Sequence, residues 1–357
     1  MIETELLCQF IQNTRFSENI LSGHFLPDNN NMAFVDSNNV ATVVVLDNTA
    51  TNKPTVAAYG AMHVCASNQA YLMFCECDAK YTEKSVTIKK CKYDEYSPER
   101  DGCRQRCWQI CNIYDKDIDY SRLPEYFGAF EDRYQQHLLV HVYDQLVNAT
   151  IKTYNMDMCK NVTVDLYDID FTDKTRWLYR DMMGFMVTDK KRYFEITINK
   201  SDLRAITENK RTKSSDVSYM ELNSENQLYF SDYDSMITVV NRHDFLEFLW
   251  GIDGMLGIVA VQNQQPIGYI LALNNHILQC YADTSDIACY LVCEISGKLS
   301  EEVPITMFMR ECSDWICSEL LEKAQKIHRI HRFHSRILPT RVKWESVFLM
   351  NIGTNLC

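Results

Sequence analysis

The stretch LPEYFGAFEDRYQQHLLVHVYDQL spans Leu123–Leu146 and joins a short glycine-containing turn to an amphipathic segment. Apolar residues recur at intervals of three and four from Glu131 to Thr153, which predicts one long helix with a buried face. A glycine turn that enters a helix often holds a phosphate, because the first helical N–H groups have no partner inside the helix. Glu131 and Asp132, however, stand where a phosphate would favour positive charge. The stretch therefore predicts a helix that covers a sheet, and it leaves open whether the turn binds an anion.

Strands are predicted before this helix. Three apolar runs bounded by turn-forming residues indicate a β-meander, and they are Ala41–Leu46, Thr55–Val64 and Ala70–Cys77. An opening helix is expected at Thr4–Gln12. Residues 78–117 are polar and cysteine-rich and show no clear period, so we treat them as an insert.

Strands and helices alternate after this helix. Asn161–Asp168 places Val162, Val164 and Leu166 on one face, as a strand does. A helix is predicted at Thr172–Met183 and a further strand at Phe185–Ile198. A meander followed by strand and helix alternation indicates an α/β layer architecture.

The second half repeats the pattern of the first. Ile258–Leu273 is an apolar strand, a polar turn and a strand that carries glycine beside tyrosine, as in the first meander. Helices are expected at Asp286–Leu299, capped by Asp283 or Ser285, and at Asp314–Arg329, and a strand at Ser346–Ile352. The repetition predicts two copies of one fold.

A domain boundary is predicted at residues 206–235, which lose helical periodicity and are rich in Ser, Asn and charge. The expected domains are residues 1–205, with the cysteine-rich insert, and residues 236–357.

Charge and composition argue against nucleic acid and membranes as partners. The net charge of −12 argues against a chain-wide grip on nucleic acid or an anionic membrane, which both require clustered Lys and Arg. Apolar runs fall short of the roughly 18–20 residues that span a bilayer. The acidic N-terminus is unlike a signal peptide, and the 15 irregularly spaced cysteines are expected to be reduced thiols. An intracellular location, cytoplasmic or nuclear, is expected, and no oligomeric state is predicted.

The order of these segments resembles the GNAT superfamily of acyl-CoA-dependent N-acetyltransferases. The second half is similar to the tandem YitH-like acetyltransferases, a family expanded in nematodes, through the segments HDFLEFLWG, IGYILAL, CYADTSDIACYLVCEI and RILPTRVKWESVFLMNI. The resemblance implies an α/β (α+β) fold of two tandem GNAT-like domains, each a mixed twisted sheet flanked by helices.

The resemblance also implies a cofactor site. GNAT proteins bind the CoA pyrophosphate with a loop of the form Arg/Gln-x-x-Gly-x-Gly/Ala before a helix, and PEYFGAF is the best match here. The resemblance therefore implies that acetyl-CoA is bound by Phe127, Gly128, Ala129 and Phe130. Phe127 replaces a basic residue of the pattern and Phe130 a small one.

The acidic pair after this loop also departs from the pattern. Carboxylates in a first turn stabilise a helix by a few tenths to about 1 kcal/mol, but they would repel a pyrophosphate by a similar amount. The corresponding junction of the second half, Tyr281–Ala288, has two aspartates and no glycine, so cofactor binding is not expected there.

Acid–base residues follow from the same resemblance. Many members use the tyrosine of Leu-Tyr-x-x-x-Gly-Phe as the acid for the departing thiolate, and Tyr179 stands before Gly184 and Phe185 with one extra residue between. One residue is about 100° around a helix, so Tyr179 is either this acid or a packed aromatic turned away from the thiol. Glu76, Asp119 and His63 lie near predicted strands and are candidates for the base that takes the proton of the amine.

Three other groups of residues could in principle form a site. Six cysteines near the insert could hold zinc, but their spacing lacks CxxC pairs, and ordinary thiols are expected instead: Cys75, Cys77, Cys91, Cys103, Cys107 and Cys111. His328, His331 and His334 would drift around a helix, which favours a solvated basic helix end over a metal site, with an acidic partner as the alternative. Trp250, Trp315 and Trp344 are expected to be core residues unless they cluster in a pocket.

Two functions remain open from the sequence. The first is an acetyl-CoA-dependent N-acetyltransferase that acts on a small or peptide amine. The second is a catalytically inactive relative that uses the GNAT fold for binding or assembly.

Overall fold

A computed structural model describes a large part of the chain in two compact units. The described residues are 10, 40–49, 54–66, 68–91, 105–115, 135–152, 160–168, 172–189, 191–210, 216–223, 225–238, 242–311, 315–338 and 342–350. The first unit comprises Met1–Thr163 with Trp177–Phe185, and the second comprises Val164–Arg176 with Met186–Cys357. The predicted opening helix, apart from Phe10, lies outside the described residues, and so does the PEYFGAF loop.

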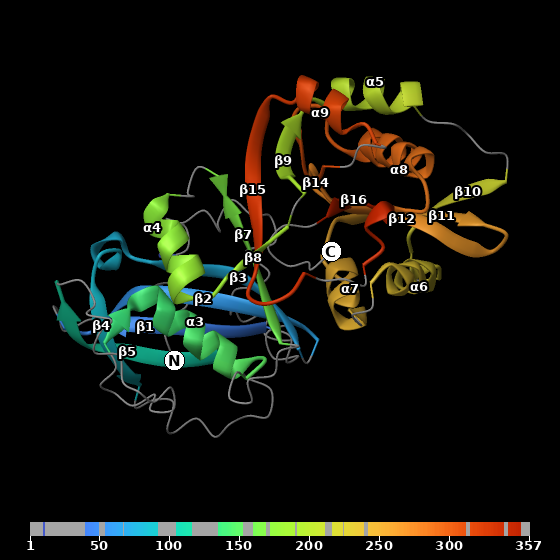
Figure 1. The fold of residues 1–357 in the computed structure, drawn as a ribbon. Helices are drawn as coiled ribbons and strands as arrows, with labels where there is room; N and C mark the ends of the chain where they lie inside the picture. Colours follow the sequence, from blue (N-terminus) through green and yellow to red (C-terminus); the bar gives the residue numbers. More distant parts are fainter. Residues whose placement is uncertain are drawn as a thin grey trace. The chain divides into compact units, whose positions relative to one another are not determined.

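The first unit is built on the predicted meander. Strands β1 (Val40–Asp47), β2 (Thr55–Ala66) and β3 (Gln69–Cys77) pair antiparallel in chain order (Figure 1). Val43, Val44 and Val45 are fully buried, which explains why β1 is apolar on both faces. Strand β7 (Asn161–Tyr167) begins beside β3, since the Asn161 N–H donates to the Asn68 carbonyl at 2.8 Å.

The insert forms a hairpin at the edge of this sheet. Strands β4 (Ser85–Lys90) and β5 (Gln105–Tyr114) pair antiparallel, and β5 also runs parallel to β1. Residues 78–84 include the short helix η3 (Ala79–Tyr81). Strands β4 and β5 of the cysteine-rich segment therefore belong to the sheet.

Helix α3 (Leu138–Ala149) packs on one face of this sheet and is shorter than the predicted helix at Glu131–Thr153. It begins at Leu138 because Gln136–His137 forms strand β6, which pairs with Ser85 and Val86 of β4. Gly60 of β2 allows the close approach of the helix. A Cβ at this position would lie 2.5 Å from Val142 Cγ1 and 2.9 Å from Leu146 Cδ1.

Replacing Gly60 with alanine is expected to lower the free energy of unfolding by about 1–3 kcal/mol, because the methyl group overpacks the interface of β2 with α3. Gly297 of α8 is the matched control. A Cβ there meets nothing within 4 Å, so Gly297→Ala is expected to stabilise by up to about 1 kcal/mol. Urea unfolding of both variants measures the two effects. Equal effects of the same sign would contradict the close packing at Gly60.

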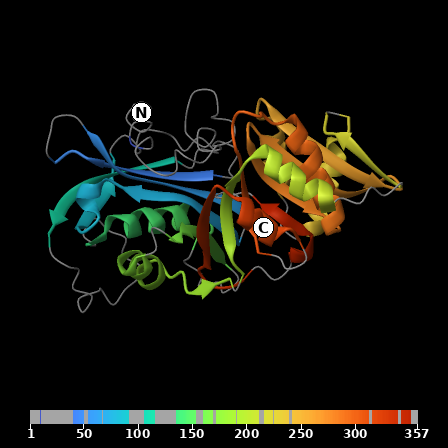
Figure 2. The ribbon, with the colours of Figure 1, turned by 90° about the horizontal axis from the view of Figure 1, so that it is seen from above.

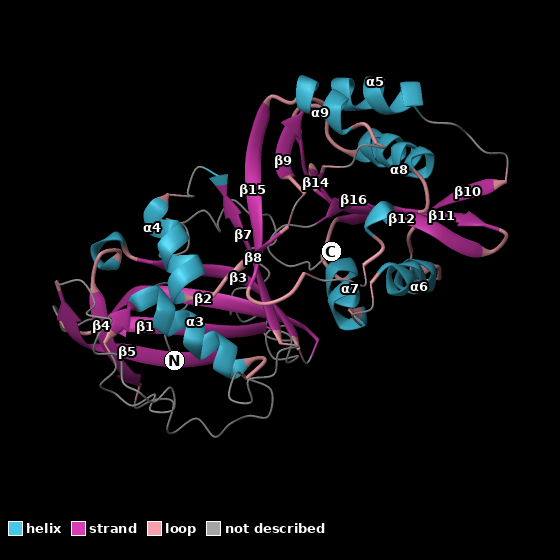
Figure 3. Ribbon diagram, viewed as in Figure 1, coloured by secondary structure: helices cyan, strands magenta, loops and turns pink. Residues whose placement is uncertain are grey.

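The second unit contains a longer mixed sheet. Strands β10 to β13 pair antiparallel in chain order, and β14 then runs parallel to the start of β13. Their bounds are β10 (Val217–Glu221), β11 (Met255–Gln262), β12 (Gln265–Leu273), β13 (His276–Ala282) and β14 (Ile305–Arg310) (Figure 3). Strand β9 (Tyr193–Ile198) pairs antiparallel with both β14 and β15 (Lys326–His334). Strand β8 (Val187–Thr188) pairs with the end of β15, and β16 (Val347–Met350) completes the sheet.

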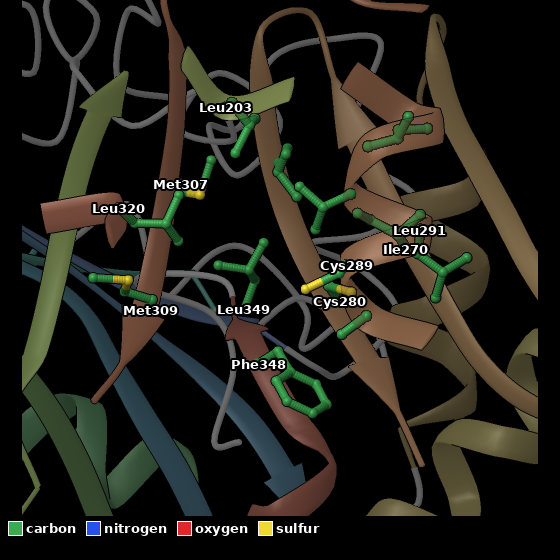
Figure 4. Close-up of a cluster of buried hydrophobic side chains, with 14 of the residues drawn as sticks. Leu203, Ile270, Cys280, Cys289, Leu291, Met307, Met309, Leu320, Phe348 and Leu349 are labelled. Atoms are coloured by element: carbon green, nitrogen blue, oxygen red, sulfur yellow. The ribbon is translucent and has the colours of Figure 1, made fainter. Parts of the chain in front are cut away.

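Helices cover both faces of this sheet. Helices α5 (Lys200–Lys210), α8 (Ser285–Lys298) and α9 (Cys317–Lys323) enclose one core, seen in Figure 2 with α5 in yellow-green and α8 in orange. Leu203, Leu291 and Leu320 of these helices meet Ile270 and Met307 of the strands in this core (Figure 4). The opposite face carries α6 (Gln227–Ile237) and α7 (His243–Trp250).

Lys200 joins two of these helices. Its buried Nζ donates to the carbonyls of Gly297 at 3.3 Å and Leu299 at 2.7 Å, and lies 2.8 Å from Glu301. These carbonyls belong to the C-terminal end of α8, where a helix is partly negative. The lysine thus satisfies the end of α8 from the start of α5.

The α/β fold class is confirmed. Several predicted helices and strands differ in their bounds from the observed ones. The predicted linker at 206–235 contains the end of α5, β10 and α6, and β9 and α5 belong to the second unit, although both precede residue 211. The predicted helix at Asp314–Arg329 is wrong beyond Lys323, because β15 begins at Lys326. The predicted Thr172–Met183 helix is α4 (Asp173–Arg176) followed by a π-helical turn, and the predicted Phe185–Ile198 strand is divided into β8 and β9.

Candidate functional site

The start of α3 is the place at which the GNAT resemblance puts a cofactor. His137 caps this helix, since its Nδ1 accepts from the Leu139 N–H at 3.2 Å and its Nε2 donates to the Thr82 carbonyl at 3.0 Å. Burial lowers the pKa of His137, in keeping with the neutral form that these two bonds require. The first turn of α3 contains no acidic residue, so the prediction that Glu131 and Asp132 open this helix is wrong. The strand pairing of β6 moves the first turn to Leu138, and Glu131 and Asp132 themselves lie outside the described residues.

Gln136 fixes the direction of α3 through a fork of two hydrogen bonds. Its Nε2 donates to His141 Nδ1 and to Asp144 Oδ2, both at 3.0 Å. His141 Nε2 donates in turn to the Val86 carbonyl of β4 at 2.9 Å. Burial raises the pKa of Asp144 to about 6, and the bond from Gln136 offsets part of this rise. The helix is thus held against β4 by side chains that follow the PEYFGAF loop.

Tyr179 lies in a π-helical turn, Trp177–Met182. The Met183 N–H donates to the Leu178 carbonyl at 3.0 Å, which is the wider i to i+5 bond of a π-helix. Such a turn accommodates one residue more than an α-helical turn, and one extra residue is what separates Tyr179 from the GNAT spacing. The Tyr179 ring packs on Phe185 with the ring centres 6.0 Å apart, and Phe185 also contacts Tyr143 of α3 at 5.4 Å.

The two candidate bases that the structure describes, His63 and Glu76, lie apart from each other. His63 of β2 is buried, whereas Glu76 of β3 is exposed. Glu76 pairs with Tyr59, which lies four residues from His63 along β2, a separation of about 13 Å. Asp119 lies outside the described residues. Of the two candidates that the structure describes, His63 and Glu76 are therefore too far apart to act as one acid–base pair.

The second unit has diverging strands that are already filled. Strands β13 and β14 pair only at His276 with Thr306 and at Ile277 with Met307. Beyond these pairs β16 lies between them, with Leu349 opposite both Cys280 and Met309. All four residues of β16 are buried. The gap that opens between β13 and β14 is thus closed by backbone pairing and apolar side chains.

Helix α8 of the second unit starts without a glycine turn. Thr284, rather than the expected Asp283 or Ser285, caps it by accepting the Ile287 N–H at 3.4 Å. Asp283 instead accepts the Tyr233 hydroxyl at 2.9 Å, and Asp286 lies in the first helical turn. The cap and the acidic first turn make this helix end a poor phosphate site.

A buried polar network lies under α6 and α7. Arg242 donates to both carboxylate oxygens of Asp234, with the Nε bond at 2.9 Å, and both side chains are almost fully buried. The Tyr269 hydroxyl donates to Asp234 at 2.5 Å and accepts from Gln279 Nε2 at 3.0 Å. The Arg242 guanidinium also lies 5.7 Å from the Tyr281 ring centre. Sequence patterns did not reveal this network, because its members lie on four separate elements.

A second charged network joins β7, β9 and β15. Arg332 donates to both oxygens of Asp165, at 2.8 and 2.7 Å, and both side chains are buried. The Tyr193 hydroxyl donates to Asp189 at 2.5 Å, and the Tyr193 ring lies 4.9 Å from the Arg332 guanidinium. Burial, and then the nearby Arg332, lower the pKa of His334 to about 4, so this histidine is neutral at pH 7.

The prediction that the three histidines form a basic helix end is wrong. His328, His331 and His334 lie on β15, where alternate residues face opposite sides. His331 Nε2 lies 2.6 Å from Asp168 Oδ1, while His328 stands beside Tyr167. The tryptophans also separate: Trp315 packs on Phe348 in the core, and Trp344 stacks on Arg310.

The described part of the chain shows neither a group of metal ligands nor a membrane-spanning helix. There, no three His, Cys, Asp or Glu side chains are grouped as metal ligands. Among the same residues, no helix has both the length and the apolar character needed to cross a bilayer.

Comparisons with known proteins give one family match and several structural likenesses. A family model described as "Domain of unknown function (DUF7596)" matches residues 27–187. No curated protein matches the sequence. The predicted site residues Phe127–Phe130 and Tyr179 all fall inside the matched segment.

The similar solved structures include three acetyltransferases or GNAT proteins. A proposed acetyltransferase from Pyrococcus horikoshii is 10% identical, with a TM-score of 0.45, and the match covers 84% of this chain and 76% of that chain. A tandem GNAT protein from the clavulanic acid biosynthesis pathway is 9% identical, with a TM-score of 0.39 and coverage of 78% and 79%. A GCN5-related N-acetyltransferase from Kribbella flavida is 7% identical, with a TM-score of 0.36 and coverage of 55% and 76%.

Proposed function

We propose that this protein is an acetyl-CoA-dependent N-acetyltransferase that acts on a small or peptide amine, with its cofactor site in the first unit. The observation that carries the proposal is the π-helical turn at Trp177–Met182. This turn supports the proposal because a π-helical turn holds one residue more than an α-helical turn, and one extra residue stands between Tyr179 and the Gly184–Phe185 pair compared with the GNAT pattern. In this proposal Phe127, Gly128, Ala129 and Phe130 form the loop that holds the cofactor pyrophosphate.

The chemistry divides between the cofactor and the chain. Acetyl-CoA supplies an activated thioester when bound. Tyr179 would donate its phenolic proton to the departing thiolate, and the ring contact with Phe185 would hold the hydroxyl in place. The amine must lose a proton before it attacks, and we assign that step to no single residue.

The second unit is proposed to be a non-catalytic copy of the same fold. Its diverging strands are filled by β16, and its helix α8 begins with a threonine cap and an aspartate. These residues do not fit a CoA molecule, which needs both the gap and the free helix end. We also propose that the chain is related to the tandem YitH-like acetyltransferases and that it is located inside the cell.

A second candidate function is a binding or assembly module without catalysis. The cap on α3 favours it, because His137 already uses one of the first helical N–H groups. The separation of His63 from Glu76 favours it as well, since no acid–base pair is assembled from them.

Calorimetric titration of the full chain with acetyl-CoA and with CoA separates the two functions. The enzyme reading predicts micromolar binding, and Gly128→Leu is expected to weaken it at least about tenfold by blocking close approach of the backbone to a phosphate. Ser285→Leu, at the first residue of α8, is the matched control and should leave binding unchanged. No heat and no thermal stabilisation at millimolar acetyl-CoA would leave only the non-catalytic module.

A further inference from the structure

Two cysteines face each other at the end of the insert hairpin where the chain passes from β4 to β5. The pairing of β4 with β5 places Lys89 opposite Gln109 and Lys90 opposite Trp108. The next position along this register brings Cys91 opposite Cys107, and the Cys91 N–H donates to the Cys107 carbonyl at 3.1 Å. The two side chains therefore leave the sheet on the same side.

The sulfur atoms of this pair are in contact. Cys91 Sγ and Cys107 Sγ lie 2.7 Å apart. Directly opposed residues of an antiparallel pair have Cβ atoms about 4.5–5.5 Å apart, close to the 3.5–4.5 Å that a disulfide requires. A bond can thus form with little movement of either strand.

The surroundings distinguish this pair from Cys111, a further insert cysteine that the structure describes. Cys91 is buried, with 3% of its surface exposed, whereas Cys107 is partly exposed and can meet a small oxidant. Cys111 lies on the same strand, but its neighbours Ile110 and Asn112 pair with Ile88 and Thr87, so no cysteine of β4 stands opposite it.

We propose that Cys91 and Cys107 form a reversible disulfide when the protein meets a two-electron oxidant of the peroxide class. The Cys107 thiolate attacks hydrogen peroxide, and Cys107 becomes a sulfenic acid as hydroxide leaves and takes up a proton. The Cys91 thiolate then attacks this sulfur and displaces the second oxygen as water. In total, two thiols and one peroxide give one disulfide and two waters.

The bond would close a covalent ring at one end of the hairpin. The other end of β4, at Ser85 and Val86, pairs with β6 just before α3. The modification thus strengthens the edge of the first unit while it leaves the pairing that positions α3 intact. The proposed disulfide does not depend on whether the chain is an acetyltransferase.

Peptide mapping of the full chain tests the proposal. The protein is reduced with dithiothreitol, freed of the reductant, treated with hydrogen peroxide, alkylated and digested. The expected result is a linked pair of peptides that carries Cys91 and Cys107, a loss of two alkylatable thiols per chain, and recovery of both thiols in dithiothreitol. The disulfide closes a ring that runs from Cys91 to Cys107, and this should also raise the unfolding midpoint by about 5 °C.

Serine variants provide the controls. Cys107→Ser and Cys91→Ser should each abolish the paired loss of thiols, and Cys111→Ser should retain it. Circular dichroism shows whether each variant folds, and the linked peptide from the unaltered chain does not depend on any variant. A bridge from Cys107 to Cys103 or Cys111, or oxidation that dithiothreitol does not reverse, would overturn the proposal.

Discussion

Replacing Asp234 with alanine is expected to lower the free energy of unfolding of the second unit by about 3–5 kcal/mol. The carboxylate is buried, and it accepts two bonds from Arg242 and one from the Tyr269 hydroxyl. Its removal leaves a guanidinium charge and a hydroxyl in an apolar surrounding, where an unpaired charge is far more costly than an unpaired neutral group. The loss should exceed that from deleting any exposed ion pair of the same unit.

Chemical unfolding of two further variants separates charge from packing. The double variant Asp234→Asn with Arg242→Met removes both charges and keeps an acceptor for Tyr269, so it should regain more than half of the lost stability. Glu208→Ala deletes an exposed pair with Arg204 and should change stability by no more than about 0.5 kcal/mol. A loss below about 1 kcal/mol for Asp234→Ala would mean that the network is not a stabilising centre of α6 and α7.

Replacing Tyr179 with phenylalanine is expected to lower kcat by about 10²- to 10⁴-fold if the chain transfers acetyl groups. The phenol would supply a proton needed only as the thiolate departs, so KM should stay nearly constant. The ring contact with Phe185 is kept in phenylalanine, and the unfolding midpoint should therefore not move. Steady-state rates with acetyl-CoA and a panel of amines, followed by release of the free thiol, measure the effect.

Tyr143→Phe is the matched control for this experiment. Tyr143 lies on α3 and its ring packs on the same Phe185, so the variant removes a hydroxyl from the same aromatic group. Its kcat should be unchanged. Equal rates in the Tyr179 variant and the unaltered chain would assign Tyr179 to packing alone.

The meander strands could be predicted because their apolar residues lie in short runs between turn-forming residues. Strand β15 could not be predicted from the sequence, because its apolar residues Ile327, Ile330 and Phe333 follow a helical spacing. In the structure Ile327 is 46% exposed, while Arg332 is buried against Asp165. Periodicity assumes that charges face the solvent, and a paired buried charge reverses that assumption.

The predicted start of helix α3 was wrong for a different reason. The apolar spacing continues back toward Glu131, but β4 offers hydrogen bonds to Gln136 and His137 that a helix would forfeit. Pairing with a distant strand thus decided the boundary, as tertiary contacts often override local preference. The ion pair of Asp165 with Arg332 escaped prediction because the two residues are separated by 167 positions in sequence.

Strand β9 constrains how this protein can be divided and how it folds. It lies between β14 and β15, both more than a hundred residues later in the chain, and pairs with each along its length. A fragment that begins after residue 205 would lack it, and would present two long unpaired strand edges that promote aggregation. Because β9 is made long before its neighbours, the second sheet also depends on contacts of high sequence separation, which close slowly. Recombinant fragments of the second unit should therefore begin before Tyr193.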